Sequence, residues 1–187
     1  MIVGIYGTGR FGSFWASALA RHAEVRTYNR SERPVPARCA GVSLEELGRC
    51  DAVMLCVAIN AVDAALDALV GHLAPGTVVM DTCSVKVHPV RSMLAAVPEG
   101  NPVIGTHPMF GPDSAGEGLG GLPMVVSPAR AEEAVVGRWE RFFASTGLRL
   151  LRMSPDEHDR EAAMTQGVTH LLGRVLADMD LAPSPIA

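Results

Sequence analysis

The chain has 187 residues, of which 48% are apolar and 19% are charged, and its formal net charge is −4. This length suits one globular domain with a further short segment, and the acidic balance argues against a general nucleic-acid-binding protein. The longest uncharged apolar stretch, residues 52–62, is shorter than the roughly 20 residues that a membrane-spanning helix needs, so we expect no membrane segment.

Predicted strands and helices alternate along most of the chain. Strands are expected at residues 1–6, 25–29, 51–57, 77–81, 103–106, 124–127 and 148–153. Helices are expected at residues 11–22, 43–47, 62–73, 89–97, 131–146 and 156–179, and the glycine-rich segment 111–121 is expected to be irregular. This alternation predicts an α/β fold with a Rossmann-type, doubly wound and mainly parallel sheet in residues 1–153.

The C-terminal segment, residues 154–187, is predicted to be a separate unit that begins with one long helix. Ser154 can cap this helix, and Pro155 suits its first position. A single helix cannot build its own core, so it must pack on the sheet domain, on a partner chain or on residues that this chain lacks. Its apolar positions between residues 168 and 179 favour a partner surface, and we therefore expect a homodimer.

The cysteines and the N-terminus indicate the compartment. The four cysteines form no CxxC pair and have no metal-like spacing with histidine, so we expect free thiols in a reducing cytosol and no metal site. Residues 1–6 carry neither a basic segment nor the cleavage signal typical of a secreted protein. The expected location is the cytoplasm.

A glycine-rich turn follows the first predicted strand and opens the first predicted helix. Its sequence is Gly7-Thr8-Gly9-Arg10-Phe11-Gly12, a GxGxxG pattern. In this context the first glycine permits a tight turn, the second lets a pyrophosphate approach the backbone, and the third allows close helix–strand packing. The turn predicts dinucleotide binding, and the alternative is a glycine-rich turn without a ligand.

The end of the second predicted strand bears on the choice of cofactor. NAD-binding units usually place Asp or Glu here to hold the ribose 2′-hydroxyl, whereas this chain has Asn29, Arg30 and Ser31. Arg30 can pair with a 2′-phosphate and Ser31 can donate to it, which predicts NADP over NAD, although Arg30 on a solvated loop is the alternative. Further cofactor-binding candidates at the end of strand 51–57 are Val57 and Ala58.

Two further motifs follow predicted strands. Residues 81–86 read DTCSVK, and residues 105–114 read GTHPMFGPDS. Because open α/β sheets bind ligands at the carboxyl ends of their strands, His107 is expected beside the nicotinamide, as a general base, with Ser84 to orient it or a substrate hydroxyl. The alternative for His107 is a turn residue bonded to backbone.

Polar residues also lie on the long C-terminal helix. Gln166 and His170 are four residues apart and share a helix face, which can line a cleft against the sheet domain. The alternative is a polar stripe that faces solvent.

Together these motifs resemble the prephenate dehydrogenase family, which includes arogenate dehydrogenases and relatives acting on amino-deoxyprephenate. Four blocks carry the resemblance: the GxGxxG turn, residues 81–86, residues 105–114, and His158-Asp159 with the downstream Gln166 and His170. The resemblance implies oxidative decarboxylation of a cyclohexadienyl acid, in the biosynthesis of tyrosine or related aromatic amino acids. It implies that His107 is the catalytic base, that Ser84 is an active-site serine, and that substrate contacts come from the C-terminal helix.

The chain also departs from the family pattern. Family members carry a further helical domain that forms the dimer and supplies an arginine for the substrate's side-chain carboxylate. Here only Lys86, Arg10 and Arg91 are basic in or near the motifs. Lys86, the only lysine, is expected to hold its loop or to supply positive potential for an anionic substrate. We expect residues 154–187 to be the first helix of an incomplete helical domain, so that the chain is truncated or another polypeptide completes the site.

Two other functions remain open. A dehydrogenase of small β-hydroxy acids shares this kind of second-strand end but usually depends on a lysine beyond the Rossmann domain, and no lysine follows Lys86. A nucleotide-binding module without turnover is the alternative from another class. The preferred interpretation is an NADP-preferring enzyme that acts on prephenate, arogenate or 4-amino-4-deoxyprephenate, with NAD as a possible cofactor.

Overall fold

One mixed β-sheet forms the centre of the protein. The computed structural model describes residues 1–116 and 118–179, apart from the side chains of Gln166 and His170. The eight described strands are ordered β3-β2-β1-β4-β5-β6-β7-β8 across the sheet. Their bounds are β1 (Ile2–Tyr6), β2 (Glu24–Tyr28), β3 (Ala40–Gly41), β4 (Ala52–Leu55), β5 (Val78–Asp81), β6 (Val103–Pro108), β7 (Pro123–Arg130) and β8 (Arg149–Arg152).

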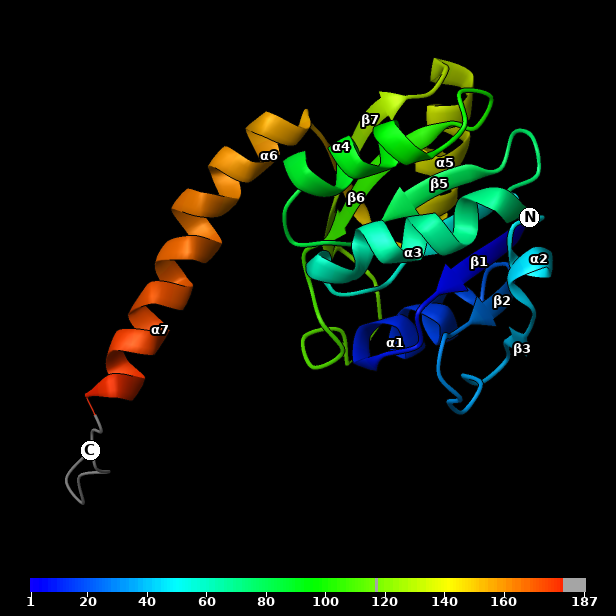
Figure 1. Cartoon of the computed structure of the whole chain (residues 1–187). Helices are drawn as coiled ribbons and strands as arrows, with labels where there is room; N and C mark the ends of the chain where they lie inside the picture. Colours follow the sequence, from blue (N-terminus) through cyan, green and yellow to red (C-terminus); the bar gives the residue numbers. More distant parts are fainter. Residues whose placement is uncertain (117, 180–187) are drawn as a thin grey trace.

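The sheet is parallel except where β6 meets β7, which run antiparallel. This confirms the predicted mainly parallel, doubly wound fold. β1 lies between β2 and β4, so the chain builds the sheet to one side of β1 and then crosses to the other (Figure 1). Tyr6 pairs in register with Tyr28 of β2 and with Leu55 of β4. The residues that follow these three strands therefore emerge together at one edge, the switch point where such sheets bind ligands.

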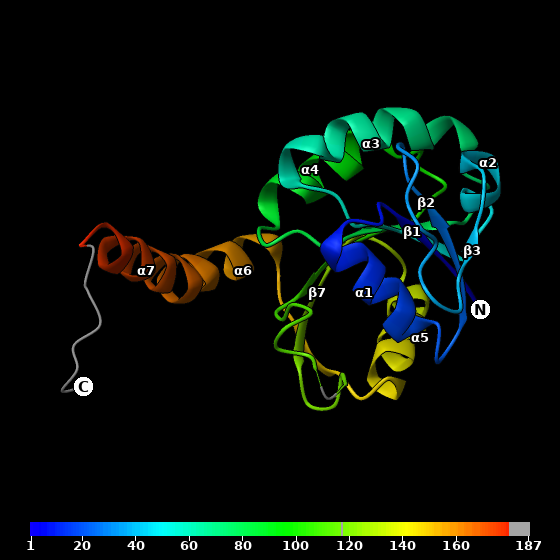
Figure 2. The ribbon, with the colours of Figure 1, turned by 90° about the horizontal axis from the view of Figure 1, so that it is seen from below.

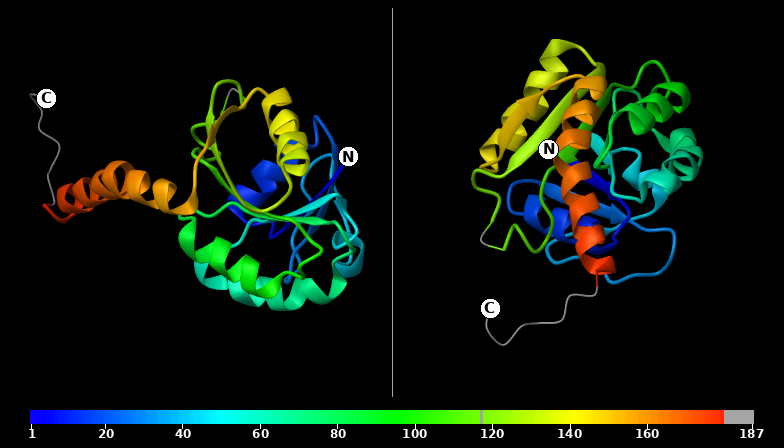
Figure 3. Two further views of the ribbon diagram at one scale, coloured as in Figure 1. Left: turned by 90° about the horizontal axis from the view of Figure 1, so that it is seen from above. Right: turned by 90° about the vertical axis from the view of Figure 1, so that its left-hand side faces the viewer.

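Helices cover both faces of the sheet. α1 and α5 lie on one face, and α3 and α4 lie on the other (Figures 2 and 3). The helix bounds are α1 (Arg10–Leu19), α2 (Leu44–Leu47), α3 (Val62–Leu69), α4 (Val87–Ala96), α5 (Glu133–Ser145), α6 (Pro155–Ala162) and α7 (Val168–Asp178). α2 begins at a capping box in which Ser43 and Glu46 bond reciprocally, as its sequence predicts.

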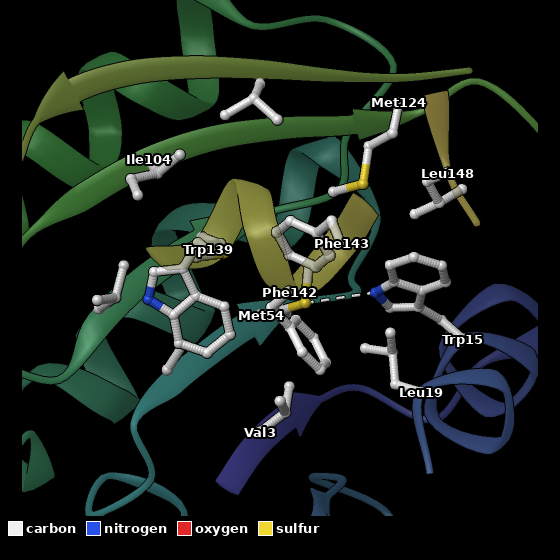
Figure 4. Close-up of a cluster of buried hydrophobic side chains, with 14 of the residues drawn as sticks. Val3, Trp15, Leu19, Met54, Ile104, Met124, Trp139, Phe142, Phe143 and Leu148 are labelled. Atoms are coloured by element: carbon white, nitrogen blue, oxygen red, sulfur yellow. Dashed lines mark hydrogen bonds between the residues drawn. The ribbon is translucent and has the colours of Figure 1, made fainter. Parts of the chain in front are cut away.

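An aromatic cluster fills the space between the sheet and the pair α1 and α5 (Figure 4). Trp15 of α1 stacks on Phe143 of α5, and its indole Nε1 donates a hydrogen bond to the Met54 sulfur at 3.3 Å. Trp139 is also buried in this cluster. Full burial of one large apolar side chain contributes about 1.5–3 kcal/mol, so this cluster holds the first helix, and with it the glycine turn, firmly on the sheet.

The C-terminal helix begins at the expected residue but is not regular throughout. Ser154 and Glu157 form a capping box, and Pro155 occupies the first turn. Residues Ala163–Gly167 form a π-helical turn between α6 and α7. α7 projects away from the sheet domain (Figure 1), and its Leu171, Leu172 and Leu176 side chains are more than half exposed. No helix within the described ranges is both long enough and apolar enough to cross a membrane.

The structure differs from the predicted elements at several places. The two-residue strand β3 was not predicted, because two residues carry no periodic pattern. The predicted strand 103–106 extends through His107 to Pro108, since antiparallel pairing with β7 continues and places His107 opposite Val125. The predicted helix 62–73 ends as an α-helix at Leu69 and continues as a single 3₁₀ turn.

Candidate active site

The three glycines of the GxGxxG turn have three different surroundings. Gly7 has φ +101°, and a Cβ atom there would lie 2.6 Å from the Cys56 carbonyl oxygen. A Cβ atom at Gly12 would lie 1.9 Å from the Gly7 carbonyl oxygen, whereas a Cβ atom at Gly9 would meet no atom within 4 Å. The first glycine therefore makes the turn, the third brings α1 against it, and the second leaves open space above the backbone.

These surroundings predict different effects on stability for two alanine substitutions. Gly12→Ala is expected to lower the free energy of unfolding by about 1–3 kcal/mol or more, because its methyl group collides with backbone. Gly9→Ala is expected to change stability by less than about 0.5 kcal/mol, because its methyl group points into open space.

Urea unfolding and titration with NADP distinguish the two variants. Gly9→Ala should keep the wild-type unfolding midpoint and lose affinity for the dinucleotide, since the methyl group occupies the space of the pyrophosphate. Wild-type NADP affinity in Gly9→Ala, or a wild-type midpoint in Gly12→Ala, would contradict this assignment.

The N-terminus of α1 is arranged to receive an anion. Gly9 is its N-cap, and no side chain caps the helix. The free N–H groups of a first helical turn attract phosphate. Asn29 holds the preceding turn in place: its Oδ1 accepts from the Thr8 N–H at 3.0 Å, and its Nδ2 donates to the Ser31 backbone oxygen at 2.7 Å. Asn29 thus links the end of β2 to the glycine turn.

A groove of about 270 Å³ runs along this edge of the sheet. Among the predicted cofactor-binding residues it is lined by Gly7, Gly9, Asn29, Arg30, Ser31, Val57 and Ala58. Small side chains form the opposite wall, at Ala61, Ala64 and Ala65. An open glycine, an uncapped helix N-terminus, an exposed arginine and a wall of alanines fit an elongated nucleotide with phosphate groups.

The other four predicted cofactor-binding residues do not line this groove. Thr8 is buried and its hydroxyl has no hydrogen-bond partner among the described residues, and Gly12 packs inward on Gly7. Phe11 lies against Trp15 with 6.0 Å between ring centroids, because the apolar cluster under α1 attracts it. Arg10 forms an exposed ion pair with Asp113 at 2.6 Å. None of these four side chains lines the groove, and the prediction that these residues bind the cofactor stays a prediction.

His107 lies in a second hollow, next to the first along the same edge. This hollow, of about 670 Å³, is also lined by Ser84, Phe110 and Ser114. The His107 ring is almost fully buried, and its Nδ1 lies 2.8 Å from Nε2 of His158. Nδ1 of His158 in turn lies 2.7 Å from Oδ1 of Asp159. Three side chains thus form a hydrogen-bonded chain from the helix α6 to the strand β6.

Asp159 anchors this chain to the start of α4. Its Oδ1 accepts from the Lys86 N–H at 2.6 Å, and its Oδ2 accepts from the Val87 N–H at 2.9 Å. Burial acts to raise the pKa of Asp159, but bonds from the Val87 N–H, the His158 ring and the Lys86 N–H outweigh burial and lower it. The carboxylate is therefore held in its ionised form.

The surroundings of His107 keep its ring neutral. Burial, followed by the charges of His158 and Lys86, lowers the pKa of His107 to about 3, and Asp159 opposes this shift. A neutral imidazole can accept a proton. The negative charges of a dianionic ligand in the hollow would favour the protonated ring and raise this pKa.

Ser84 and the C-terminal helix border the same hollow. Ser84 is exposed and lines it, but no hydrogen bond joins Ser84 to His107 among the described residues. Thr165 and Thr169, which directly precede the two predicted substrate-binding residues, also line it. The side chains of Gln166 and His170 themselves lie outside the described residues.

The structure favours the first of the two roles expected for Lys86, which is to hold its loop. Its side chain is fully buried, and its ammonium group pairs with the Asp81 carboxylate inside the protein. Asp81 Oδ2 also accepts from the Cys83 N–H at 3.0 Å, and Oδ1 accepts from the Thr106 N–H at 3.2 Å. Lys86 therefore does not present its charge to a ligand in the hollow. It stabilises the loop that carries Ser84 and the start of α4.

His158 and Asp159 belong to the site, although the sequence predicted no role for them. The sequence placed them in the first turns of a capped helix, which is compatible with exposed positions. The sequence signal that could have identified them is the adjacent pair His158-Asp159, which belongs to one of the four blocks that carry the family resemblance. Only the packing of α6 against α4 brings this pair to His107 on β6. Figure 1 shows α6 at the same end of the sheet domain as α4.

Comparisons with known proteins find one matching family model and several similar proteins. Residues 23–147 match the family model described as prephenate dehydrogenase, nucleotide-binding domain. The chain is 32% identical over 197 residues to arogenate dehydrogenase 2, chloroplastic, from Arabidopsis thaliana, which covers 98% of this chain and 55% of that protein. It is 30% identical over 165 residues to 4-amino-4-deoxyprephenate dehydrogenase from Streptomyces pristinaespiralis, covering 82% of this chain and 52% of that protein.

Solved structures show the same fold. The crystal structure of prephenate dehydrogenase from Aquifex aeolicus, in complex with hydroxyphenyl propionate and NAD+, is similar with a TM-score of 0.78 and 20% identity. The match covers 96% of this chain and 68% of that one. The chain spans 55% and 31% of the length of the two Arabidopsis relatives that it matches over 98% of its own residues.

Proposed function

Because this chain belongs to the prephenate dehydrogenase family, we propose that it carries out the oxidative decarboxylation of prephenate or a close analogue, arogenate or 4-amino-4-deoxyprephenate. NADP is the proposed oxidant, and the proposed setting is aromatic or amino-aromatic acid biosynthesis in the cytoplasm. The observation that carries this proposal is the position of His107, a neutral and almost buried imidazole in a hollow beside the nucleotide groove. We assign nucleotide binding to residues 1–153 and the start of a helical domain to residues 154–187.

The chemistry requires the protein to handle one proton. A bound nicotinamide supplies the acceptor for the hydride that leaves the ring carbon of the substrate. His107 takes the proton of the substituent on that carbon as the C–H bond breaks. The C–C bond to the carboxylate then breaks, carbon dioxide leaves, and the electron pair enters the ring, which becomes aromatic. His107 returns its proton to the substituent, so the protein ends unchanged and its main tasks are orientation and proton storage.

Ser84 and the C-terminal helix complete the proposed substrate contacts. Ser84 donates to the ring substituent or to His107, since it lines the same hollow. Gln166 and His170 contact the substrate from the helix whose neighbouring threonines line that hollow. The apolar face of α7, with Leu171 and Leu176 more than half exposed, is the proposed contact of a homodimer.

The NADP preference rests on the residues after β2. Arg30 and Ser31 line the groove, and Arg30 is exposed and makes no ion pair among the described residues. Glu32, the nearest carboxylate in sequence, lines a neighbouring hollow instead. A 2′-phosphate would thus meet a free guanidinium without a repelling carboxylate in the groove.

Arg30→Ala is expected to weaken the binding of NADP far more than that of NAD. Loss of a charged hydrogen bond costs about 1–3 kcal/mol, so the Kd for NADP should rise by about 5- to 150-fold. Calorimetric titration with both nucleotides measures this difference. Arg149→Ala, which removes an exposed arginine from the far edge strand β8, is the matched control for net charge. Equal losses for both nucleotides in Arg30→Ala would overturn the assignment.

The activity itself is tested on the purified chain. Incubation with NADP and prephenate, arogenate or the 4-amino analogue should produce reduced nicotinamide, and the preferred acid identifies the substrate. The second candidate is a nucleotide-binding module without turnover. One observation favours it: among the described residues that line the hollow around His107, none is a lysine or arginine. Tight NADP binding without turnover on any of the three acids would select the module.

A further inference from the structure

The hydrogen-bonded chain Asp159–His158–His107 joins parts of the protein that are far apart in sequence. His107 lies on β6, and the other two residues lie on α6, with ring nitrogens 2.8 Å apart at one link and nitrogen and oxygen 2.7 Å apart at the other. His158 is as deeply buried as the residues of the apolar core. Because His158 is buried between two polar partners, each of its ring nitrogens must act either as a hydrogen-bond donor or as an acceptor.

The bonds that Asp159 makes determine which ring nitrogens of His158 and His107 carry a proton. The Asp159 carboxylate already accepts two backbone N–H groups, and as an ionised carboxylate it can only accept. His158 must therefore donate from Nδ1, and when its ring is uncharged its Nε2 can only accept. Nδ1 of His107 must then donate to that Nε2. The lone pair of His107 is left on its own Nε2, the ring nitrogen that has no bonding partner among the described residues.

We propose that His158 and Asp159 are positioning residues that fix the tautomer of His107, so that its Nε2 accepts the substrate proton. The inference rests on the proposed role of His107 as the base. When Nε2 takes the proton, Nδ1 keeps its own proton and its bond to His158, and the carboxylate of Asp159 stabilises the positive ring through the intervening imidazole. The same proton then returns to the product, so no proton needs to travel along the chain.

The tautomer of His107 can be measured without turnover. Two-bond ¹H–¹⁵N correlation spectra of the full chain, with the His107 signals assigned from the His107→Gln variant, should show a protonated Nδ1 and an unprotonated Nε2 near neutral pH. In Asp159→Asn, the amide can donate to His158, which reverses the direction of both bonds. This variant should shift the proton of His107 toward Nε2.

Kinetic variants separate positioning from mere packing. His158→Phe keeps a ring but loses both bonds, and its kcat should fall by about 100-fold or more with KM changed by less than about threefold. His158→Gln can still accept from His107 and donate toward Asp159, so it should recover most of that loss. His88→Gln, at an exposed histidine of α4, is the control that should alter neither the spectrum nor kcat.

The outcomes distinguish this inference from the proposed function. An Nδ1-protonated His107 that changes tautomer in Asp159→Asn supports the inference even if no cyclohexadienyl acid is turned over. A wild-type His107 with its proton on Nε2, or equal kcat values in His158→Phe and His158→Gln, would overturn it. If Asp159→Asn fails to fold, because Asp159 also joins α6 to α4, the comparison of the two His158 variants decides the question.

Discussion

In the His107→Asn variant, kcat is expected to fall by about 10²- to 10⁴-fold, the range that a positioned general base contributes. Asparagine can still bond to His158, but its amide cannot take a proton at neutral pH. The groove that receives the nucleotide is lined by other residues, so the Kd for NADP should stay within about twofold of wild type. Steady-state kinetics with the preferred cyclohexadienyl acid and a parallel nucleotide titration provide the two measurements.

Ser114→Ala is a useful companion to this variant. Ser114 lines the same hollow, but its hydroxyl oxygen already accepts a hydrogen bond from the Gly111 N–H at 2.9 Å. This variant should therefore keep kcat within about tenfold of wild type, as expected for a side chain that handles no proton. If His107→Asn retains more than about a tenth of the wild-type kcat, the imidazole does not act as the base and the proposed chemistry fails.

In the Lys86→Met variant, the free energy of unfolding is expected to fall by about 3–5 kcal/mol, because the change leaves the Asp81 carboxylate buried without its cation. Both side chains of this pair are fully buried, so water cannot replace the lost partner. The main chain of Lys86 also bonds to Asp159, so loosening here disturbs the start of α4 and the attachment of α6. Urea unfolding followed by circular dichroism measures the loss.

The double variant Lys86→Met with Asp81→Asn tests the cause of this loss. Removing both charges removes the unpaired buried ion, and we expect at least half of the lost stability to return. A single variant that loses less than about 1 kcal/mol would show that Lys86 acts elsewhere, for example by turning its charge toward a ligand. In that case the second role expected for Lys86, to supply positive potential for an anionic substrate, would be favoured.

The nucleotide half of the site was predictable because its information is local. Gly7, Gly9 and Gly12 lie within one turn, and the chemistry of each follows from its spacing to the adjacent strand and helix. The helix caps at Ser43 and Ser154 are equally local and occur at the residues expected. Such features depend on backbone geometry over a few residues, which the sequence specifies directly.

The half of the site around His107 depended on contacts between distant segments. The sequence predicted that His107 lies near the carboxyl end of a strand. It did not predict the hydrogen bond from His107 to His158, a residue 51 positions away. It left open whether Lys86 holds its loop or offers its charge to a ligand, and the fold buries that side chain against Asp81. In each case the deciding energy is the cost of leaving a polar group unpaired in the interior, and that cost depends on which neighbours the folded chain supplies.

Sequence alone determined the alternation of strands and helices, the glycine-rich turn and the family to which the chain belongs. Periodicity, spacing and motif letters are properties of the linear chain. Tertiary structure alone decided which side chains face the hollow, which are buried as structural ions, and which ring nitrogen of His107 is free. Those properties arise when α6 packs on α4 and β6, because burial removes water and forces every donor to find an acceptor within the protein.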